Sequence, residues 1–175
     1  REWFTTIVPI EDRVIDPEQQ TSLKERFYEG VSARYEHILA DLDVPRPRIL
    51  QLIHEAFTNG KVVIVHGVSG QGKTTLALRY LHDYLPEQWR FFVHSPESIS
   101  QALSIANAIS HHAQSMNVPL VVYLDVKPSD TDWTETVREL AFVPNIRILV
   151  TIRDDDLRRA SFSAIDFPYS TIELQ

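Results

Sequence analysis

The sequence predicts a three-layer α/β domain built on a five-stranded, mainly parallel β-sheet, and three observations support this fold class. Apolar, β-branched runs typical of strands buried on both faces alternate with segments of helical periodicity. A glycine-rich turn joins one of these runs to a helical segment. The chain contains no internal repeat and no Gly/Ser linker. Strands that alternate with helices imply a parallel sheet with helices on both faces.

The composition is that of a globular protein and excludes several classes. The 175 residues are 43% hydrophobic and 23% charged, which excludes a disordered or low-complexity chain. The 17 Lys and Arg against 24 Asp and Glu give a net charge of −7, which argues against a general nucleic-acid binder. The longest apolar run, Val118–Leu124, is far too short to span a membrane. The absence of Cys excludes disulfides and thiolate metal sites, and fits a cytoplasmic location.

The chain divides into an N-terminal arm, residues 1–44, and an α/β core, residues 45–175. The first residues of the arm are expected to be extended. Apolar residues then recur every three or four positions and predict an amphipathic helix over Gln19–Leu42, weakened at Gly30. Pro45 and a second proline two residues later interrupt the pattern, which places the boundary there.

The first half of the core alternates helix and strand. The segment after Pro47 has an apolar helical face that stops at Asn59-Gly60, and a β-branched run follows. Ser95-Pro96 is a favourable helix start, because Ser caps a helix and Pro suits its first position. The predicted elements are a helix between Pro47 and Asn59, a strand over 61–66, a helix over 73–84, a strand over 89–94 and a helix from Ser95 to Met116.

The second half of the core contains two more apolar runs of strand length, Pro119–Asp125 and Asn145–Ile152. Between them, apolar residues at helical spacing predict a short helix. The predicted elements are a strand over 119–125, a helix over 133–140, a strand over 145–152, one or two helical turns over 154–160 and a last strand over 169–174.

The sequence Gly67-Val-Ser-Gly-Gln-Gly-Lys-Thr74 matches the phosphate-loop pattern G-x-x-x-x-G-K-[ST] at every fixed position. Its glycines allow backbone N–H groups to surround phosphate oxygens at a helix N-terminus, where the dipole favours an anion. Lys73 is predicted to bind the β- and γ-phosphates, and the Thr74 hydroxyl to ligate Mg²⁺. The residues expected to bind nucleotide are Gly67, Val68, Ser69, Gly70, Gln71, Gly72, Lys73, Thr74 and Thr75.

Asp125 follows an apolar strand and is the predicted acid on the Mg²⁺ side of the site, the Walker B position. The alternative is an ordinary Asp at the end of a buried strand. Many hydrolytic relatives have a second acid directly after this Asp to activate water, but this chain has Val126, which predicts slow hydrolysis. The seven His show no ligand spacing with a nearby acid, so we expect no metal other than Mg²⁺.

Arg153 ends the strand over 145–152 and is the third candidate catalytic residue, with Lys73 and Asp125. A cation at this strand tip could contact a γ-phosphate and so distinguish a triphosphate from a diphosphate. The alternative is a surface Arg paired with the acidic run Asp154–Asp156. In a helix, these acids would lie at the N-terminus and Arg158-Arg159 at the C-terminus, where the helix dipole favours negative and positive charge respectively.

These motifs resemble the STAND class of signal-transduction ATPases, which includes NACHT and NB-ARC modules and bacterial antiviral proteins. The resemblance covers about residues 45–175. Val63–Thr75 is similar to the Walker A sequence of that class, Val121–Asp125 to its Walker B sequence and Ile148–Arg153 to its sensor strand. By the same resemblance, Arg46 lies in a turn beside the adenine; the alternative is a solvated turn.

The resemblance implies a P-loop NTPase fold of the ASCE type, with the sensor strand between the Walker A and Walker B strands. It also implies binding of ATP or ADP with Mg²⁺ in a switch: ATP favours an open, oligomerising state and ADP a closed one. We therefore expect a homo-oligomeric full-length protein in bacterial antiphage defence, with a trigger such as a phage protein. No membrane or nucleic-acid partner is expected for this domain.

The start at Arg1 indicates a piece of a longer protein, and the resemblance implies that helical and winged-helix subdomains lie outside it. Two other functions stay open, and a third, a GTPase, is disfavoured. A small-molecule kinase needs an acceptor site and an arginine-rich lid, and a nucleotide-binding scaffold needs no turnover. A GTPase needs an Asn-Lys-x-Asp motif, which Lys127-Pro-Ser-Asp130 does not supply.

Overall fold

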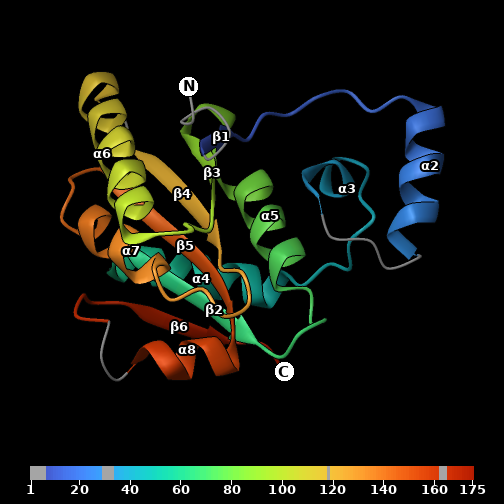
Figure 1. Ribbon diagram of the computed structural model, residues 1–175. Helices are drawn as coiled ribbons and strands as arrows, with labels where there is room; N and C mark the ends of the chain where they lie inside the picture. Colours follow the sequence, from blue (N-terminus) through green and yellow to red (C-terminus); the bar gives the residue numbers. More distant parts are fainter. Residues whose placement is uncertain (1–6, 29–33, 118, 162–164) are drawn as a thin grey trace.

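The computed structural model describes residues 7–28, 34–117, 119–161 and 165–175. Within these residues the strands form one sheet in the order β1-β3-β4-β5-β2-β6, with helices on both faces (Figure 1). The predicted α/β class is confirmed. The sheet has six strands rather than five, because the leading segment expected to be merely extended adds β1 at one edge.

The sheet is parallel except for β1, which pairs antiparallel with β3. The sensor strand β5 lies between β2 and β4, as the resemblance implied. The carboxyl ends of these three strands meet at one edge, since Gly67 is in register with Arg153 and Asp125 with Thr151. The strands are β1 (Ile7–Pro9), β2 (Val62–Gly67), β3 (Arg90–His94), β4 (Leu120–Asp125), β5 (Ile146–Arg153) and β6 (Ser170–Glu173).

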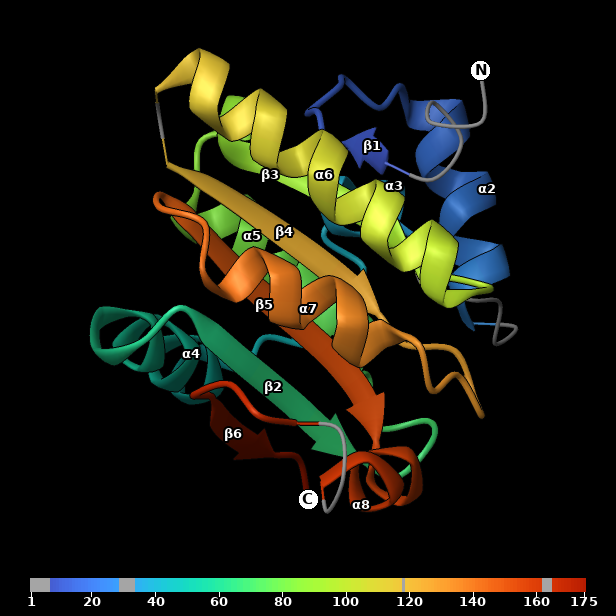
Figure 2. The same cartoon turned by 60° about the vertical axis from the view of Figure 1, so that its left-hand side comes forward.

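Helices α6 and α7 cover one face of the sheet and α4 and α5 the other (Figure 2). Strand β2 is buried on both faces: Val62 and Ile64 belong to the core under α6 and α7, Val63 and Val65 to the core under α4 and α5. The helices are α2 (Pro17–Tyr28), α3 (Tyr35–Leu39), α4 (Pro47–Asn59), α5 (Lys73–Tyr84), α6 (Ile99–Met116), α7 (Trp133–Ala141) and α8 (Asp154–Ser161).

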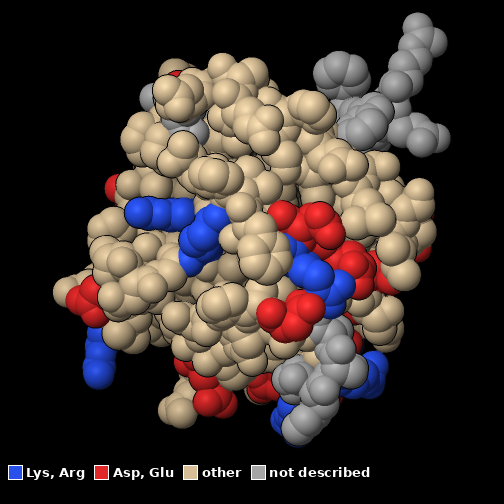
Figure 3. Space-filling view, turned by 90° about the vertical axis from the view of Figure 1, so that its left-hand side faces the viewer, with Lys and Arg blue, Asp and Glu red and all other residues tan. Residues whose placement is uncertain are grey.

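Helix α6 contains no Asp, Glu, Lys or Arg. Figure 3 accordingly shows a broad uncharged area on this side of the molecule, with acidic and basic side chains interleaved elsewhere on the same face. No described helix is long and apolar enough to cross a membrane.

The single helix predicted over Gln19–Leu42 is wrong. The arm forms two helices instead, α2 and the one-turn α3, and Gly30 lies outside the described residues. Arg34 precedes α3 in an extended conformation, and its backbone N–H donates to His37 Nδ1 at 3.0 Å. Of the described residues of α2, none belongs to either core cluster; α2 packs on α3 instead, where the rings of Phe27 and His37 lie 5.0 Å apart. The apolar spacing therefore continues across a break that the pattern does not reveal.

The predicted helix start at Ser95 is also wrong. Helix α6 begins at Ile99, and Ser98 caps it, because the Ser98 Oγ accepts a 3.1 Å hydrogen bond from the Gln101 backbone N–H. The Ser95 hydroxyl instead donates to the Asp130 carboxylate in the loop after β4. The Ser95 side chain, which the local sequence favours as a helix cap, therefore forms a tertiary hydrogen bond with Asp130 instead.

Two arginines of the core hold the arm. Arg90 is fully buried; its guanidinium donates to the Ile10 carbonyl at 3.0 Å, the Asp12 carboxylate at 3.0 Å and the Tyr35 hydroxyl at 2.7 Å. Arg79 on α5 donates through Nε to Asp43 Oδ2 at 2.9 Å. The arm is thereby fixed beside α5, the helix that follows the phosphate loop.

Candidate functional site

The phosphate loop connects the end of β2 to the start of α5. Gly70 and Gly72 have φ of +84° and +76°, a region that disfavours side chains, so glycine is required at both positions. A Cβ on Gly67 would lie 2.3 Å from Gln71 Oε1 and 3.1 Å from the Leu174 carbonyl oxygen. Three glycines of the motif therefore follow from backbone conformation and close packing.

Lys73 is the first residue of α5 and its ammonium group turns back onto the loop. Lys73 Nζ donates to the carbonyl oxygens of Val68 at 2.7 Å and Gly67 at 3.2 Å. Burial lowers the pKa of Lys73, while the carboxylates of Asp125 and Asp154 oppose that shift. The ammonium thus lies against the loop backbone and close enough to Asp125 and Asp154 for their charges to affect its pKa.

Asp125 and Thr74 are in contact, although 51 residues separate them. Thr74 Oγ1 donates to Asp125 Oδ2 at 3.1 Å, and Thr151 Oγ1 donates to Asp125 Oδ1 at 2.6 Å. The Tyr123 hydroxyl lies 2.8 Å from Thr151 Oγ1. Burial raises the pKa of Asp125, and the two hydroxyl donors and Lys73 partly offset it. A carboxylate and a hydroxyl are hard oxygen donors of the kind Mg²⁺ prefers, so these residues fit the ion.

Arg153 ends β5 directly beside the loop, in register with Gly67. Its Nε donates to Asp156 Oδ2 at 3.0 Å, which is the pairing with the acidic run that the sequence offered as the alternative. Asp154 Oδ1 lies 2.7 Å from His66 Nδ1, so the neighbouring acid has a different partner. The contact of Arg153 with a phosphate stays a prediction.

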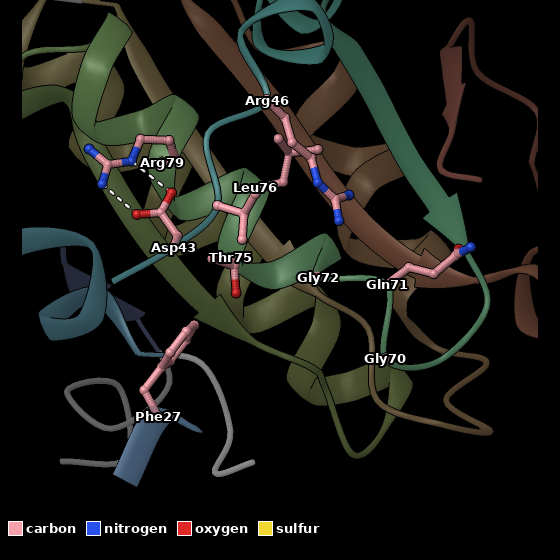
Figure 4. A pocket seen from close by; sticks show the side chains of 10 residues that line it. Phe27, Asp43, Arg46, Gly70, Gln71, Gly72, Thr75, Leu76 and Arg79 are labelled. Carbon is pink, nitrogen blue, oxygen red and sulfur yellow. Dashed lines mark hydrogen bonds and ion pairs between the residues drawn. The ribbon is translucent and has the colours of Figure 1, made fainter. Parts of the chain in front are cut away.

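A pocket of about 150 Å³ lies between the arm and the phosphate loop (Figure 4). Arg46, the residue before α4, points into it, and Arg46 Nη2 lies 3.9 Å from where a Cβ on Gly72 would stand. The structure therefore brings Arg46 to the loop. The pocket is lined by Phe27, Asp43, Val44, Arg46, Gly70, Gln71, Gly72, Thr75, Leu76 and Arg79.

A larger cavity, of about 550 Å³, includes Thr74 and Asp125 in its wall. The opposite wall comes from the arm, around Ile10 and Tyr35. The cavity therefore adjoins the groups that fit Mg²⁺.

The residues after Asp125 bear on hydrolysis. Val126, at the position where a second acid would stand, is buried. Asp130 accepts from the Ser95 hydroxyl and, at 2.8 Å, from the Asp132 backbone N–H. Among the described residues, no group of three or more His, Cys, Asp or Glu is arranged to hold a further metal ion.

Thr151 is not among the site residues predicted from the sequence, and Asp156 is not singled out there. Thr151 orients the Asp125 carboxylate, and its signal is a hydroxyl inside the apolar run 148–152. The sequence offers Asp156 only within the run Asp154–Asp156, as a partner of Arg153 or as part of a helix cap; the structure buries it and pairs it with Arg153. Nothing in the sequence distinguishes Asp156 from Asp154 and Asp155; the packing of α8 does.

Residues 25–164 match the family described as Novel STAND NTPase 5, which covers more than half of the chain. No curated protein sequence matches the chain significantly.

Solved structures similar to this chain include ATPases. A Walker-type ATPase of Pyrococcus abyssi has 10% identity and a TM-score of 0.44, over 76% of this chain and 54% of that one. A STAND protein with a tetratricopeptide repeat sensor from Pyrococcus horikoshii has 17% identity and a TM-score of 0.46, over 75% and 23%. C. elegans PCH-2 has 13% identity and a TM-score of 0.45, over 89% and 41%. The match spans about half or less of each of these proteins.

Proposed function

The chain belongs to the STAND NTPases, as a member of the family described as Novel STAND NTPase 5, and from this premise we propose that it is an ATP-dependent nucleotide switch. In this proposal Mg²⁺-ATP binds at the loop Gly67–Thr75, with Lys73, Asp125 and Arg153 around the terminal phosphate. The observation that carries it is the 3.1 Å contact between Thr74 Oγ1 and Asp125 Oδ2, which joins two distant motifs at the start of α5.

Lys73 and the N-terminus of α5 supply the attraction for the phosphates. The carbonyl oxygens that Lys73 Nζ now contacts are neutral, whereas phosphate oxygens are charged and make stronger hydrogen bonds with an ammonium group. The unpaired N–H groups at the start of α5 add a favourable dipole. Lys73 therefore exchanges loop carbonyls for phosphate oxygens when nucleotide binds.

Thr74 and Asp125 are the proposed protein ligands of Mg²⁺. Bound there, the ion would neutralise charge on the phosphate oxygens. Asp125 must be ionised to serve as a ligand, and the hydroxyls of Thr74 and Thr151 both donate to it and stabilise its charged form.

The base is proposed to occupy the pocket between the arm and the loop. Val44 and Leu76 give this pocket apolar surface, and Arg46 and Thr75 add polar groups beside the loop. The resemblance implies adenine here, and the guanine-recognition motif is not present in the sequence. Adenine nucleotides are therefore the proposed ligands.

Hydrolysis to ADP and phosphate is proposed to be slow. Val126 supplies no base, and Asp130 already accepts hydrogen bonds from Ser95 and Asp132. A nucleotide-binding scaffold without turnover would have the same site, and only a rate measurement separates the two.

A second candidate function is phosphoryl transfer to a small molecule. The observation that favours it is the 550 Å³ cavity beside Thr74 and Asp125, which is within the size range of small-ligand sites. A kinase would release ADP faster when an acceptor is added, whereas a switch would show the same slow rate with and without one.

Control of oligomerisation, a role in antiphage defence and triggering by a phage protein are proposals that come from the STAND resemblance alone. Mixing the full-length protein with ATP or ADP and measuring its mass in solution tests the first. ATP is expected to give the larger species.

The test of the proposed function is the nucleotide that the purified protein carries and prefers. The protein is denatured, the released nucleotide is identified by chromatography, and ATP and GTP then compete for the stripped protein. We expect ADP or ATP to be recovered and ATP to outcompete GTP. Recovery of a guanine nucleotide, or equal competition by GTP, would contradict the proposal.

A further inference from the structure

Arg153 is held by a buried carboxylate. The Asp156 side chain is only 3% exposed, and its Oδ2 accepts from Arg153 Nε at 3.0 Å, one turn further along the chain in α8. Arg153 itself is 39% exposed. The contact uses Nε, and among the described residues the two Nη groups make no hydrogen bond or ion pair. The guanidinium is therefore fixed at one edge while its other edge can bind a second anion.

The other oxygen of Asp156 holds the loop that follows Asp125. Asp156 Oδ1 accepts from the Ser129 backbone N–H at 3.1 Å, across 27 residues. Ser129 has a φ of +66°, a conformation that is unfavourable for a side-chain-bearing residue and persists where its surroundings hold it. One carboxylate thus joins the end of β5 to the loop between β4 and α7.

The three acids at the start of α8 have different partners. Asp154 contacts His66, while Asp155 is 76% exposed and lies 3.9 Å from Arg158. Only Asp156 of the three is buried and contacts Arg153. Arg159 Nη1 lies 3.7 Å from Asp156 Oδ1 and adds positive charge on the outer side. Asp155 is therefore a matched control for Asp156, because it has the same side chain but does not contact Arg153.

Arg153 lies close to the proposed phosphate site. Arg153 is in register with Gly67, the first residue of the loop, and it is among the groups that affect Lys73 electrostatically. A γ-phosphate on Lys73 would add about two negative charges near Arg153. A diphosphate places no such charge there, so an oriented Arg153 favours the triphosphate.

We propose that Asp156 is a positioning residue that orients Arg153 through Nε toward the γ-phosphate and couples that contact to the Ser129 loop. This inference rests on the proposed function. When the triphosphate binds Arg153, the chain of contacts from Arg153 through Asp156 to Ser129 is tightened. The backbone after Asp125 thereby responds to the third phosphate.

The test compares Asp156→Asn with Asp155→Asn, which makes the same chemical change one position away. We measure the affinities of the chain for Mg²⁺-ATP and Mg²⁺-ADP and take their ratio. Asp156→Asn is expected to lower the preference for ATP about tenfold, within the usual range of coupling between sites, with ADP affinity unchanged. Asp155→Asn is expected to leave both affinities unchanged.

Two further variants separate orientation from a structural role. Arg153→Lys retains the charge but removes the Nε–H that Asp156 uses, so it should lower the ATP preference like Asp156→Asn. In Arg153→Ala, adding Asp156→Asn should cause no further loss. Hydrogen exchange at the Ser129 amide should slow with ATP relative to ADP in the natural sequence but not in Arg153→Lys.

An unchanged ATP preference in Asp156→Asn, or equal losses for ATP and ADP, would overturn the inference and leave the proposed function standing. Failure of the unaltered chain to bind either nucleotide would overturn the proposed function itself. If Asp156→Asn does not fold, Arg153→Lys carries the test, because Arg153 is partly exposed and a lysine fits there.

Discussion

Two carboxylates lie near the proposed phosphate site, Asp125 at the end of β4 and Asp156 in α8, and they differ in the charge of their hydrogen-bond donors. Asp125 accepts from the hydroxyls of Thr74 and Thr151, both uncharged donors. Asp156 accepts from a guanidinium and a backbone N–H. Asp125 therefore keeps a charge that no contacting cation neutralises, which is what a metal ligand needs, whereas the charge of Asp156 is paired. Neutralising each one tests this difference.

The largest expected effect is the loss of Mg²⁺-dependent nucleotide affinity in Asp125→Asn. Mutation of a residue that only hydrogen-bonds to a metal ligand typically lowers metal affinity about 10–100-fold. Removal of the charged ligand itself should therefore lower Mg²⁺-dependent ATP affinity about a hundredfold or more. The measurement is ATP affinity with Mg²⁺ and with a chelator. The control is Asp132→Asn, an acid seven residues away, whose curve should match the natural sequence; an equal loss there would contradict the assignment.

Stability should change in opposite directions when the two acids are neutralised. Asp125→Asn should stabilise the nucleotide-free protein at pH 7 by about 1 kcal/mol, because an unneutralised charge is no longer buried. Asp156→Asn should destabilise it by about 1–2 kcal/mol, less than a fully buried pair because Arg153 is partly exposed and screened. Urea unfolding measures both, and changes of the same sign would refute the contrast.

A smaller effect is expected from Thr151→Val, which removes one donor to Asp125 and the partner of the Tyr123 hydroxyl. A buried hydroxyl left without a partner costs about 1–3 kcal/mol, so unfolding in urea should show a loss in this range. The pKa of Asp125 should rise further, since one group that stabilises the charged form is gone. Mg²⁺-ATP affinity measured at pH 6 should therefore fall more than at pH 8.

The smallest effect is a pH dependence of the Asp125→Asn stability gain. Burial raises the pKa of Asp125 in the folded protein above its unfolded value, so the folded state binds the proton more readily. The destabilisation by Asp125 is complete above the folded pKa and disappears as the pH falls through it toward the unfolded value. The stability gain of Asp125→Asn, followed from pH 7 to pH 4, should shrink; a constant gain would argue against burial as the cause.

The core could be predicted closely from the sequence, and the arm could not. Apolar runs set the strands β2, β4 and β5 because both faces of each are buried, and α5 has the predicted bounds. The arm depends on single contacts: a buried Arg90 that binds Ile10 and Asp12, and a side chain of His37 that accepts from Arg34. Contacts of this kind leave no periodicity in the sequence.

The site divides in the same way. Lys73, Thr74 and Asp125 follow from motifs whose spacing is fixed by the chemistry of phosphate binding, and Arg153 follows from its place after a buried strand. The partner of Arg153 could not be predicted from the sequence, because Asp154, Asp155 and Asp156 are the same residue type at consecutive positions. Only the packing of α8 distinguishes them. The contact of Asp156 with Ser129 is likewise tertiary.

The central claim is that the loop Gly67–Thr75 binds Mg²⁺-ATP, and the most direct test is calorimetric titration of the chain and of Lys73→Ala. Removing one partner of a charged, hydrogen-bonded contact lowers the binding affinity by at least about thirtyfold. Lys73→Ala should therefore bind ATP at least about thirtyfold more weakly than the unaltered chain. The matched control is Lys24→Ala on the exposed side of α2, which should bind as the natural sequence does. Equal ATP affinity in Lys73→Ala and the unaltered chain would contradict the claim.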